Sequence, residues 1–98
     1  MKIVVKKVGQ MPEIKEVENE LHVLQDIVGG WIECFRMGLG NMVCVCNDDG
    51  KYLCLHVNFV HNFDPICGDV FFCGTEHEDF TSLNDQQINF IMEIFSGI

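Results

Sequence analysis

The chain has 98 residues, a formal net charge of −9, 48% hydrophobic residues and 2 prolines. This length allows one domain with a modest core and excludes a two-domain enzyme, while the hydrophobic content excludes a disordered chain. The negative charge argues against direct binding to nucleic acid, because phosphate backbones are recognised by clustered Lys and Arg. We therefore expect residues 1–98 to form a single folded domain.

Apolar runs are short throughout the chain. None reaches the roughly 20 residues needed to span a bilayer, and the run at residues 3–5 is shorter than the ~7–15 apolar residues of an export signal. We therefore expect a cytoplasmic protein that does not bind membranes. Six cysteines would predict disulfides in a secreted chain, but here they predict free thiols or metal ligands.

The first third of the chain predicts a strand followed by a helix. Residues 2–8 alternate β-branched and basic side chains, as in a strand with one solvated face. Apolar residues recur at helical spacing between residues 21 and 28, with Asn19 as a candidate N-cap. Gly29 and Gly30 predict the end of this helix.

The middle of the chain predicts three further strands, at residues 31–37, 42–47 and 51–57. The last two flank the turn sequence "NDDGK" at residues 47–51 and predict a β-hairpin. Residues 58–65 show no clean period, so we expect an irregular connection there.

The last third predicts a short aromatic strand at residues 68–74, an acidic loop at residues 75–82 and a final helix. Ser82 and Asp85 have the spacing of a capping box at the start of that helix. The order strand, helix, four strands, helix predicts an α+β fold. We expect a small, mostly antiparallel sheet of four or five strands with both helices packed on one face.

The turn at residues 47–51 admits two hairpin registers, which place opposite sets of side chains on each face. A three-residue loop with Gly50 as a left-handed bulge puts Val43 and Val45 on a uniformly apolar face. A two-residue loop mixes Val with Cys and His on both faces. We prefer the three-residue loop, because it leaves one apolar face for the helices to cover.

This register also assembles a candidate zinc site. Cys44 then lies directly across from Cys54, with Cys46 and His56 as near neighbours, and opposed β-carbons about 4.5–5.5 Å apart allow shared ligation. His61 or Cys67, from the following segment, can complete a tetrahedron of thiolates and imidazoles. The sequence contains no Cys-x-x-Cys knuckle, so ordinary packing of thiols and a redox pair remain alternatives.

Charge is distributed unevenly along the chain. Every Lys and Arg lies at or before Lys51, whereas the remainder carries acids without any Lys or Arg. Such a surface attracts a basic partner, although it also serves simply to keep a protein soluble. The candidate partner-binding residues of this acidic half are Asp64, Asp69, Glu76, Glu78 and Asp79.

Sequence signatures of catalysis are missing. No Ser lies on a nucleophile elbow, no glycine-rich phosphate loop is present, and "VGGWIE" has the wrong spacing for a dinucleotide-binding turn. We therefore expect a protein that is not an enzyme.

Four segments together resemble a known family: "LQDIVGGWIE", "VCNDDGK", "GDVFFCG" and "EDFTSLNDQQI". The chain is similar, from about residue 24 to residue 91, to small acidic proteins of phages, plasmids and gut bacteria that are classed as a domain of unknown function. The family has no assigned catalytic residues, so none can be transferred. The present chain departs from it in its many cysteines and in "LHVNFVHNF".

The resemblance implies an interaction protein, because phage-borne acidic proteins of this size resemble defence inhibitors, including anti-CRISPR proteins. It implies a non-catalytic inhibitor, in the cytoplasm of a bacterial host cell, that binds a host nucleic-acid-handling protein such as a CRISPR-Cas effector. The acidic half would occupy a basic surface normally reserved for DNA or RNA. Two alternatives are a small zinc-binding protein that uses the Cys and His face, and a sponge or sensor for a small ligand.

Overall fold

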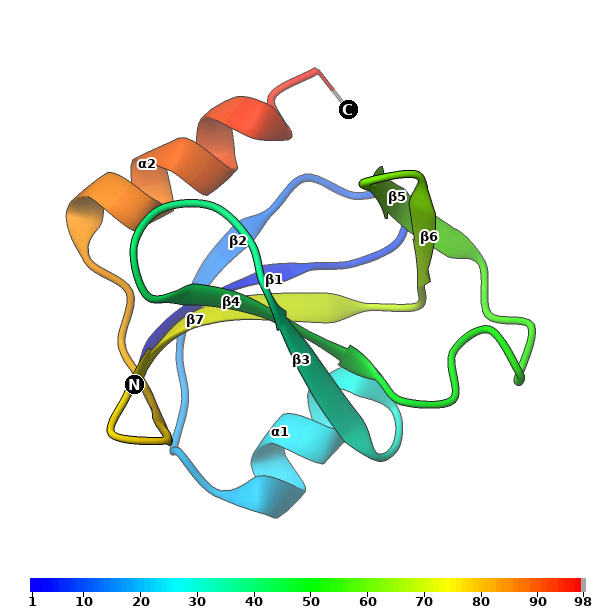
Figure 1. The fold of residues 1–98 in the computed structure, drawn as a ribbon, viewed down its shortest axis with the longest axis horizontal. Coiled ribbons are helices and arrows are strands. Elements are labelled where there is room, and N and C mark those ends of the chain that lie inside the picture. Colours follow the sequence, from blue (N-terminus) through cyan, green and yellow to red (C-terminus); the bar gives the residue numbers. More distant parts are fainter. Residues whose placement is uncertain (98) are drawn as a thin grey trace.

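The computed structural model describes residues 1–97, which form two helices and eight strands (Figure 1). Six strands form one antiparallel sheet in the order β2-β1-β7-β4-β3, with β8 paired to β7, and β5 pairs with β6 in a separate hairpin. The predicted α+β fold with a mostly antiparallel sheet is confirmed. In chain order the elements are β1 (Lys2–Lys6), β2 (Glu13–Glu16), α1 (Leu21–Val28), β3 (Ile32–Arg36), β4 (Met42–Asn47), β5 (Val57–His61), β6 (Asp64–Cys67), β7 (Val70–Glu76), β8 (Asp79–Thr81) and α2 (Asp85–Ile94).

The two helices lie on opposite faces of the sheet, with α1 below it and α2 above it in Figure 1. Val43 and Val45 of β4 share a core cluster with Leu24 of α1, whereas Cys44 shares a second cluster with Ile91 of α2. The prediction that both helices pack on one face is therefore wrong. Because β4 and β7 are apolar at successive positions, both faces of the sheet need a cover.

The predicted hairpin between residues 42–47 and residues 51–57 does not form. Both edges of β4 are occupied by other strands, β3 on one side and β7 on the other. The chain after β4 instead folds into successive turns, in which Leu53 N–H donates to the Asp49 carbonyl (2.8 Å) and Leu55 N–H donates to the Gly50 carbonyl (3.0 Å). The predicted strand at residues 51–57 is therefore wrong, and so are both registers proposed for it.

Residues 58–65, for which we predicted an irregular connection, instead form most of the β5–β6 hairpin. The edge strands β2 and β8 were also missed, because each is short and largely polar or exposed. None of the helices described within residues 1–97 is long and apolar enough to cross a membrane.

The helix ends are partly as predicted. Gly29 is the left-handed C-cap of α1 (φ 81°), as predicted, but α1 begins after Glu20 without a side-chain cap. The capping box of α2 uses Asn84 and Gln87, whose side chains bond each other's backbone N–H (2.8 and 2.9 Å). Ser82, predicted for this role, instead accepts a hydrogen bond from the Lys2 N–H (2.9 Å).

Candidate functional site

The structure separates the predicted zinc ligands. Cys44 is fully buried in β4, while Cys54 and His56 are exposed in the turns that follow it. The ring of His61, in β5, stacks against Phe35, with 5.2 Å between the ring centroids. No group of three or more His, Cys, Asp or Glu side chains within residues 1–97 is arranged to hold a metal ion. The prediction that Cys44 faces Cys54 and His56 is therefore wrong, because it required a hairpin that does not form.

Buried thiols serve as core packing. Cys44 lies between its register partners Phe35 of β3 and Phe72 of β7, and all six cysteines are free. Burial raises the pKa of Cys44 and raises the pKa of Cys46 and Cys73 to about 12. These three thiols are neutral at physiological pH, which makes them poor metal ligands and poor nucleophiles.

The five candidate partner-binding acids lie at three separate places in the fold. Glu76, Glu78 and Asp79 lie together on the exposed β7–β8 hairpin, at the lower left of Figure 1. Asp69 precedes β7 at its other end, where it accepts a hydrogen bond from the Val8 N–H (2.9 Å). Asp64, in β6, forms an ion pair with Lys51. The five acids therefore do not form a single surface.

The β7–β8 hairpin joins a second acidic segment, which precedes α1. The side-chain amide of Asn19 donates to the Phe80 carbonyl of β8 (3.0 Å), and a hollow of about 290 Å³ between the two segments is lined by Leu21, Glu78 and Asp79, among others. The exposed carboxylates of these two segments form what we call the acidic hairpin surface: Glu18, Glu20, Glu76, Glu78 and Asp79.

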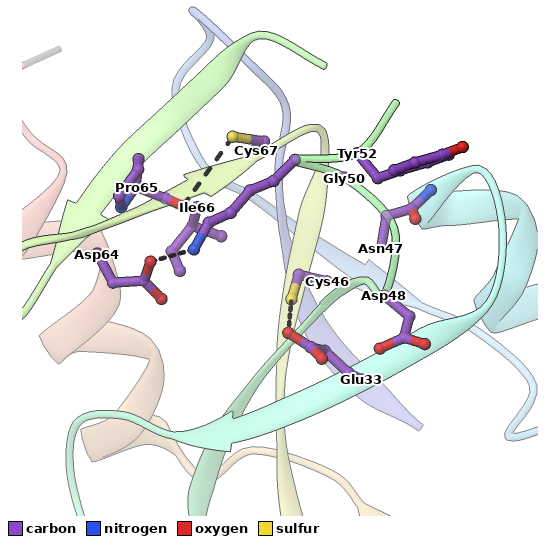
Figure 2. A pocket seen from close by; sticks show the side chains of 11 residues that line it. Glu33, Cys46, Asn47, Asp48, Gly50, Tyr52, Asp64, Pro65, Ile66 and Cys67 are labelled. Atoms are coloured by element: carbon purple, nitrogen blue, oxygen red, sulfur yellow. Dashed lines mark hydrogen bonds and ion pairs between the residues drawn. The ribbon is translucent and has the colours of Figure 1, made fainter. Parts of the chain in front are cut away.

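A separate pocket of about 230 Å³ lies between the end of β4, the turns that follow it and β6 (Figure 2). Gly50 allows the turn to approach β6, since a β-carbon at this position would lie 2.8 Å from the Cys67 carbonyl oxygen. This close approach explains the glycine, and Gly50 is not the left-handed bulge that we predicted. The residues that line the pocket are Glu33, Cys46, Asn47, Asp48, Gly50, Lys51, Tyr52, Asp64, Pro65, Ile66 and Cys67.

Opposite charges face this pocket. Lys51 pairs with Asp64 on one wall, and on the other the Cys46 thiol donates to the Glu33 carboxylate (3.8 Å), as the dashed lines in Figure 2 mark. Burial raises the pKa of Glu33, and the hydrogen bond and negative charge of Asp48 raise it further. The pocket can therefore offer one cation, from Lys51, and the carboxyl groups of Glu33, Asp48 and Asp64 to a small polar molecule.

Comparison with known protein families matches residues 1–96 to DUF3846, a domain of unknown function. The chain belongs to the DUF3846 family. Neither the comparison with curated proteins nor that with solved structures finds a significant match. Membership of a domain-of-unknown-function family is thus confirmed over nearly the whole chain, whereas phage origin and an inhibitory role stay predictions.

Sequence reasoning missed several features of this DUF3846 domain. Glu33 lies on β3 and Asp48 directly follows β4, so the two side chains come close only because β3 pairs with β4. Glu18 and Glu20 flank Asn19, whose side chain bonds the Phe80 carbonyl of β8 across 61 residues of sequence. The run of acids "EVENE" before α1 was a visible signal of charge, but only the fold shows where that charge lies.

Proposed function

We propose that this DUF3846 protein is a small acidic, non-catalytic binding protein that occupies a basic surface on a host nucleic-acid-handling protein. The supporting observation is the acidic hairpin surface, where five carboxylates from two segments are exposed together. Within residues 1–97 no ion pair joins a Lys or Arg to these carboxylates, and the pairs they form are those of Glu20 with His22 and of Glu76 with His77, both exposed histidines. Uncompensated exposed charge of this kind attracts a surface of opposite sign.

The remaining charges strengthen this field. Of the six Lys and Arg residues, Lys6 is fully buried and Lys51 is paired with Asp64, so neither offsets the acids at the surface. The net charge of −9 repels nucleic acid and attracts the basic surface with which another protein binds nucleic acid. A bacterial defence protein such as a CRISPR-Cas effector presents such a surface, and the protein would act in the cytoplasm of the host cell.

Competition with DNA tests this proposal. A purified CRISPR effector is mixed with fluorescent target DNA, and increasing amounts of the wild-type DUF3846 protein are added. The fraction of DNA that stays bound to the effector is measured at low and at physiological salt. We expect wild-type protein to displace the DNA at both salt concentrations. The triple variant Glu76→Gln, Glu78→Gln, Asp79→Asn should be at least about tenfold weaker, because its hairpin charge is removed.

A second triple variant controls for net charge. Glu13→Gln, Asp49→Asn and Glu93→Gln remove the same charge from exposed positions outside the acidic hairpin surface. This control should compete as well as wild type. Equal weakening of both triple variants, or displacement that vanishes at physiological salt, would show nonspecific charge attraction and overturn the proposal.

The pocket in Figure 2 favours a second candidate function, a sponge or sensor for a small polar ligand. Lys51 can bind an anionic group while Glu33 binds a cationic one, as in a zwitterion. The native mass of protein purified from cells tests this candidate. A native mass that exceeds the mass of the chain by that of a small molecule, and that returns to the mass of the chain in Lys51→Met, supports this candidate. A native mass equal to that of the chain, together with a thermal unfolding temperature that added amino acids do not change, rules it out.

A further inference from the structure

A large aromatic side chain is exposed at the C-terminal end of α1. Trp31 follows the Gly29–Gly30 pair and is 68% exposed. It borders a hollow of about 420 Å³ together with Gln25 and Asp26 of the last turns of α1. Exposed tryptophan is depleted on free surfaces and enriched where proteins bind one another.

A second hollow of about 420 Å³ borders the first, and Asp26 and Gly29 contribute to the lining of both. Its walls are largely apolar, with Ile27 of α1 on one side and Leu53 of the turn segment on the other. We call these two adjacent hollows together the Trp31 groove. It has an aromatic end, a carboxylate near its middle and aliphatic walls beyond.

The Trp31 groove is electrostatically negative. Asp26 contributes a carboxylate, and the C-terminal end of α1 contributes the negative end of the helix dipole without a basic residue in its last turn. Asp69 adds further charge, although one of its oxygens already accepts the Val8 N–H. Within the described part of the chain, the lining of the two hollows includes no Lys or Arg, and its basic side chain is that of His56.

We propose that the Trp31 groove binds the side chain of an arginine. A planar guanidinium can stack on the indole of Trp31 and donate two hydrogen bonds to the Asp26 carboxylate, which an ammonium group cannot do. The methylene groups of the same arginine match the aliphatic walls. The inference rests on the proposed function for the source of this arginine, which is the basic surface of the partner.

The groove and the acidic hairpin surface lie toward opposite ends of α1. Leu24 lines the hollow beside the β7–β8 hairpin, and its neighbour Gln25 lines the Trp31 groove. An eight-residue helix is about 12 Å long, so one basic surface can reach both sites. The acidic hairpin surface then attracts the partner, and the groove holds one of its side chains.

Titration with short peptides tests the proposal directly. Trp31 is the only tryptophan, so its indole N–H gives a single resonance in a ¹⁵N-labelled sample. Acetyl-Ala-Arg-Ala-amide should shift this resonance and the amides of Gly29 and Gly30 saturably. The same peptide with lysine in place of arginine should bind more weakly. The same peptide with citrulline, which is uncharged, in place of arginine should not bind.

Two variants assign the contacts. Asp26→Asn should weaken arginine binding about tenfold, because it keeps the shape of the side chain and removes its charge. Glu93→Gln, on α2, removes one exposed charge on the other face and should leave binding unchanged. Equal binding of the arginine and lysine peptides, or shifts spread over all acids without saturation, would overturn the proposal.

The outcomes for the groove and for the proposed function are separable. Saturable peptide binding without displacement of DNA from the effector would retain the groove and reject the proposed function. Displacement of DNA that is unaffected by both Trp31→Ala and Asp26→Asn would retain the proposed function and reject the groove as its contact.

Discussion

At the scale of single residues, the most unusual side chain is Lys6, which is 0% exposed at the end of β1. Its ammonium group donates to the Asn58 side chain and to the Lys7 carbonyl (2.9 Å each), and lies 5.7 Å from the ring centroid of Phe95. Burial lowers the pKa of Lys6, and the negative charge of Asp69 opposes that shift. Lys6 thus ties the main sheet to the β5–β6 hairpin.

Replacing Lys6 should destabilise the fold strongly. Lys6→Ala leaves a buried cavity and two acceptors without their donor, so we expect the free energy of unfolding to fall by about 3 kcal/mol in urea denaturation. Lys7→Ala, at an exposed neighbour, is the control and should change it by less than about 0.5 kcal/mol. A loss for Lys6→Ala no larger than that of the control would show that the buried network contributes little.

At the scale of elements, the β5–β6 hairpin has a strained turn. His61 pairs with Asp64, so the loop consists of Asn62 and Phe63, both with left-handed backbones (φ 49° and 64°). This geometry suits the right-handed twist of the strands but normally selects Asn-Gly. Phe63 is 100% exposed, so no contact within the chain compensates for its strained backbone.

Glycine at this position should stabilise the protein. Phe63→Gly should raise the free energy of unfolding by roughly 0.5–1 kcal/mol, because glycine adopts a left-handed backbone without a steric cost. Phe63→Ala keeps the β-carbon and should change it little, which makes it the matched control in thermal or urea unfolding. A gain in the alanine variant as large as that in the glycine variant would assign the effect to the lost ring rather than to the backbone.

Local patterns predicted most elements but not their pairing. The continuous apolar runs of β4 and β7 and the periodicity of α1 and α2 are properties of neighbouring residues, and these elements form where predicted. The turn sequence "NDDGK" also satisfied local rules for a hairpin. It failed because β4 gains more by pairing with β7, a strand distant in sequence that is buried along most of its length.

At the scale of the whole molecule, three buried thiols make the free energy of unfolding depend on pH in the alkaline range. The pKa of Cys46 and of Cys73 is about 12 in the folded protein and near 9 for an ordinary cysteine, and that of Cys44 is also raised. Above about pH 9 the unfolded chain loses these protons while the folded chain keeps them, so stability falls as pH rises. Lys6 acts in the opposite direction, because its folded pKa is lowered.

The three thiols should outweigh the single lysine. We expect the free energy of unfolding in reducing buffer to fall between pH 8 and pH 11, by on the order of 2 kcal/mol for Cys73 and by a further amount for Cys44 and Cys46. Cys73→Ala should show a shallower fall, whereas Cys54→Ala, which removes an exposed thiol, should show the same fall as wild type. An equal fall in all three proteins would contradict the assignment to buried thiols.

The sequence by itself determined the composition-level properties of this protein, which are its acidic charge, its α+β class, its high cysteine content and the signals for two helices and the central strands. These depend on residue type and local spacing, which a chain displays without folding. Only the tertiary structure decided that the helices cover opposite faces and that Cys44, Cys46 and Cys73 pack in the core. It likewise brought the acids beside α1 and left Trp31 exposed, because each depends on which distant strands pair.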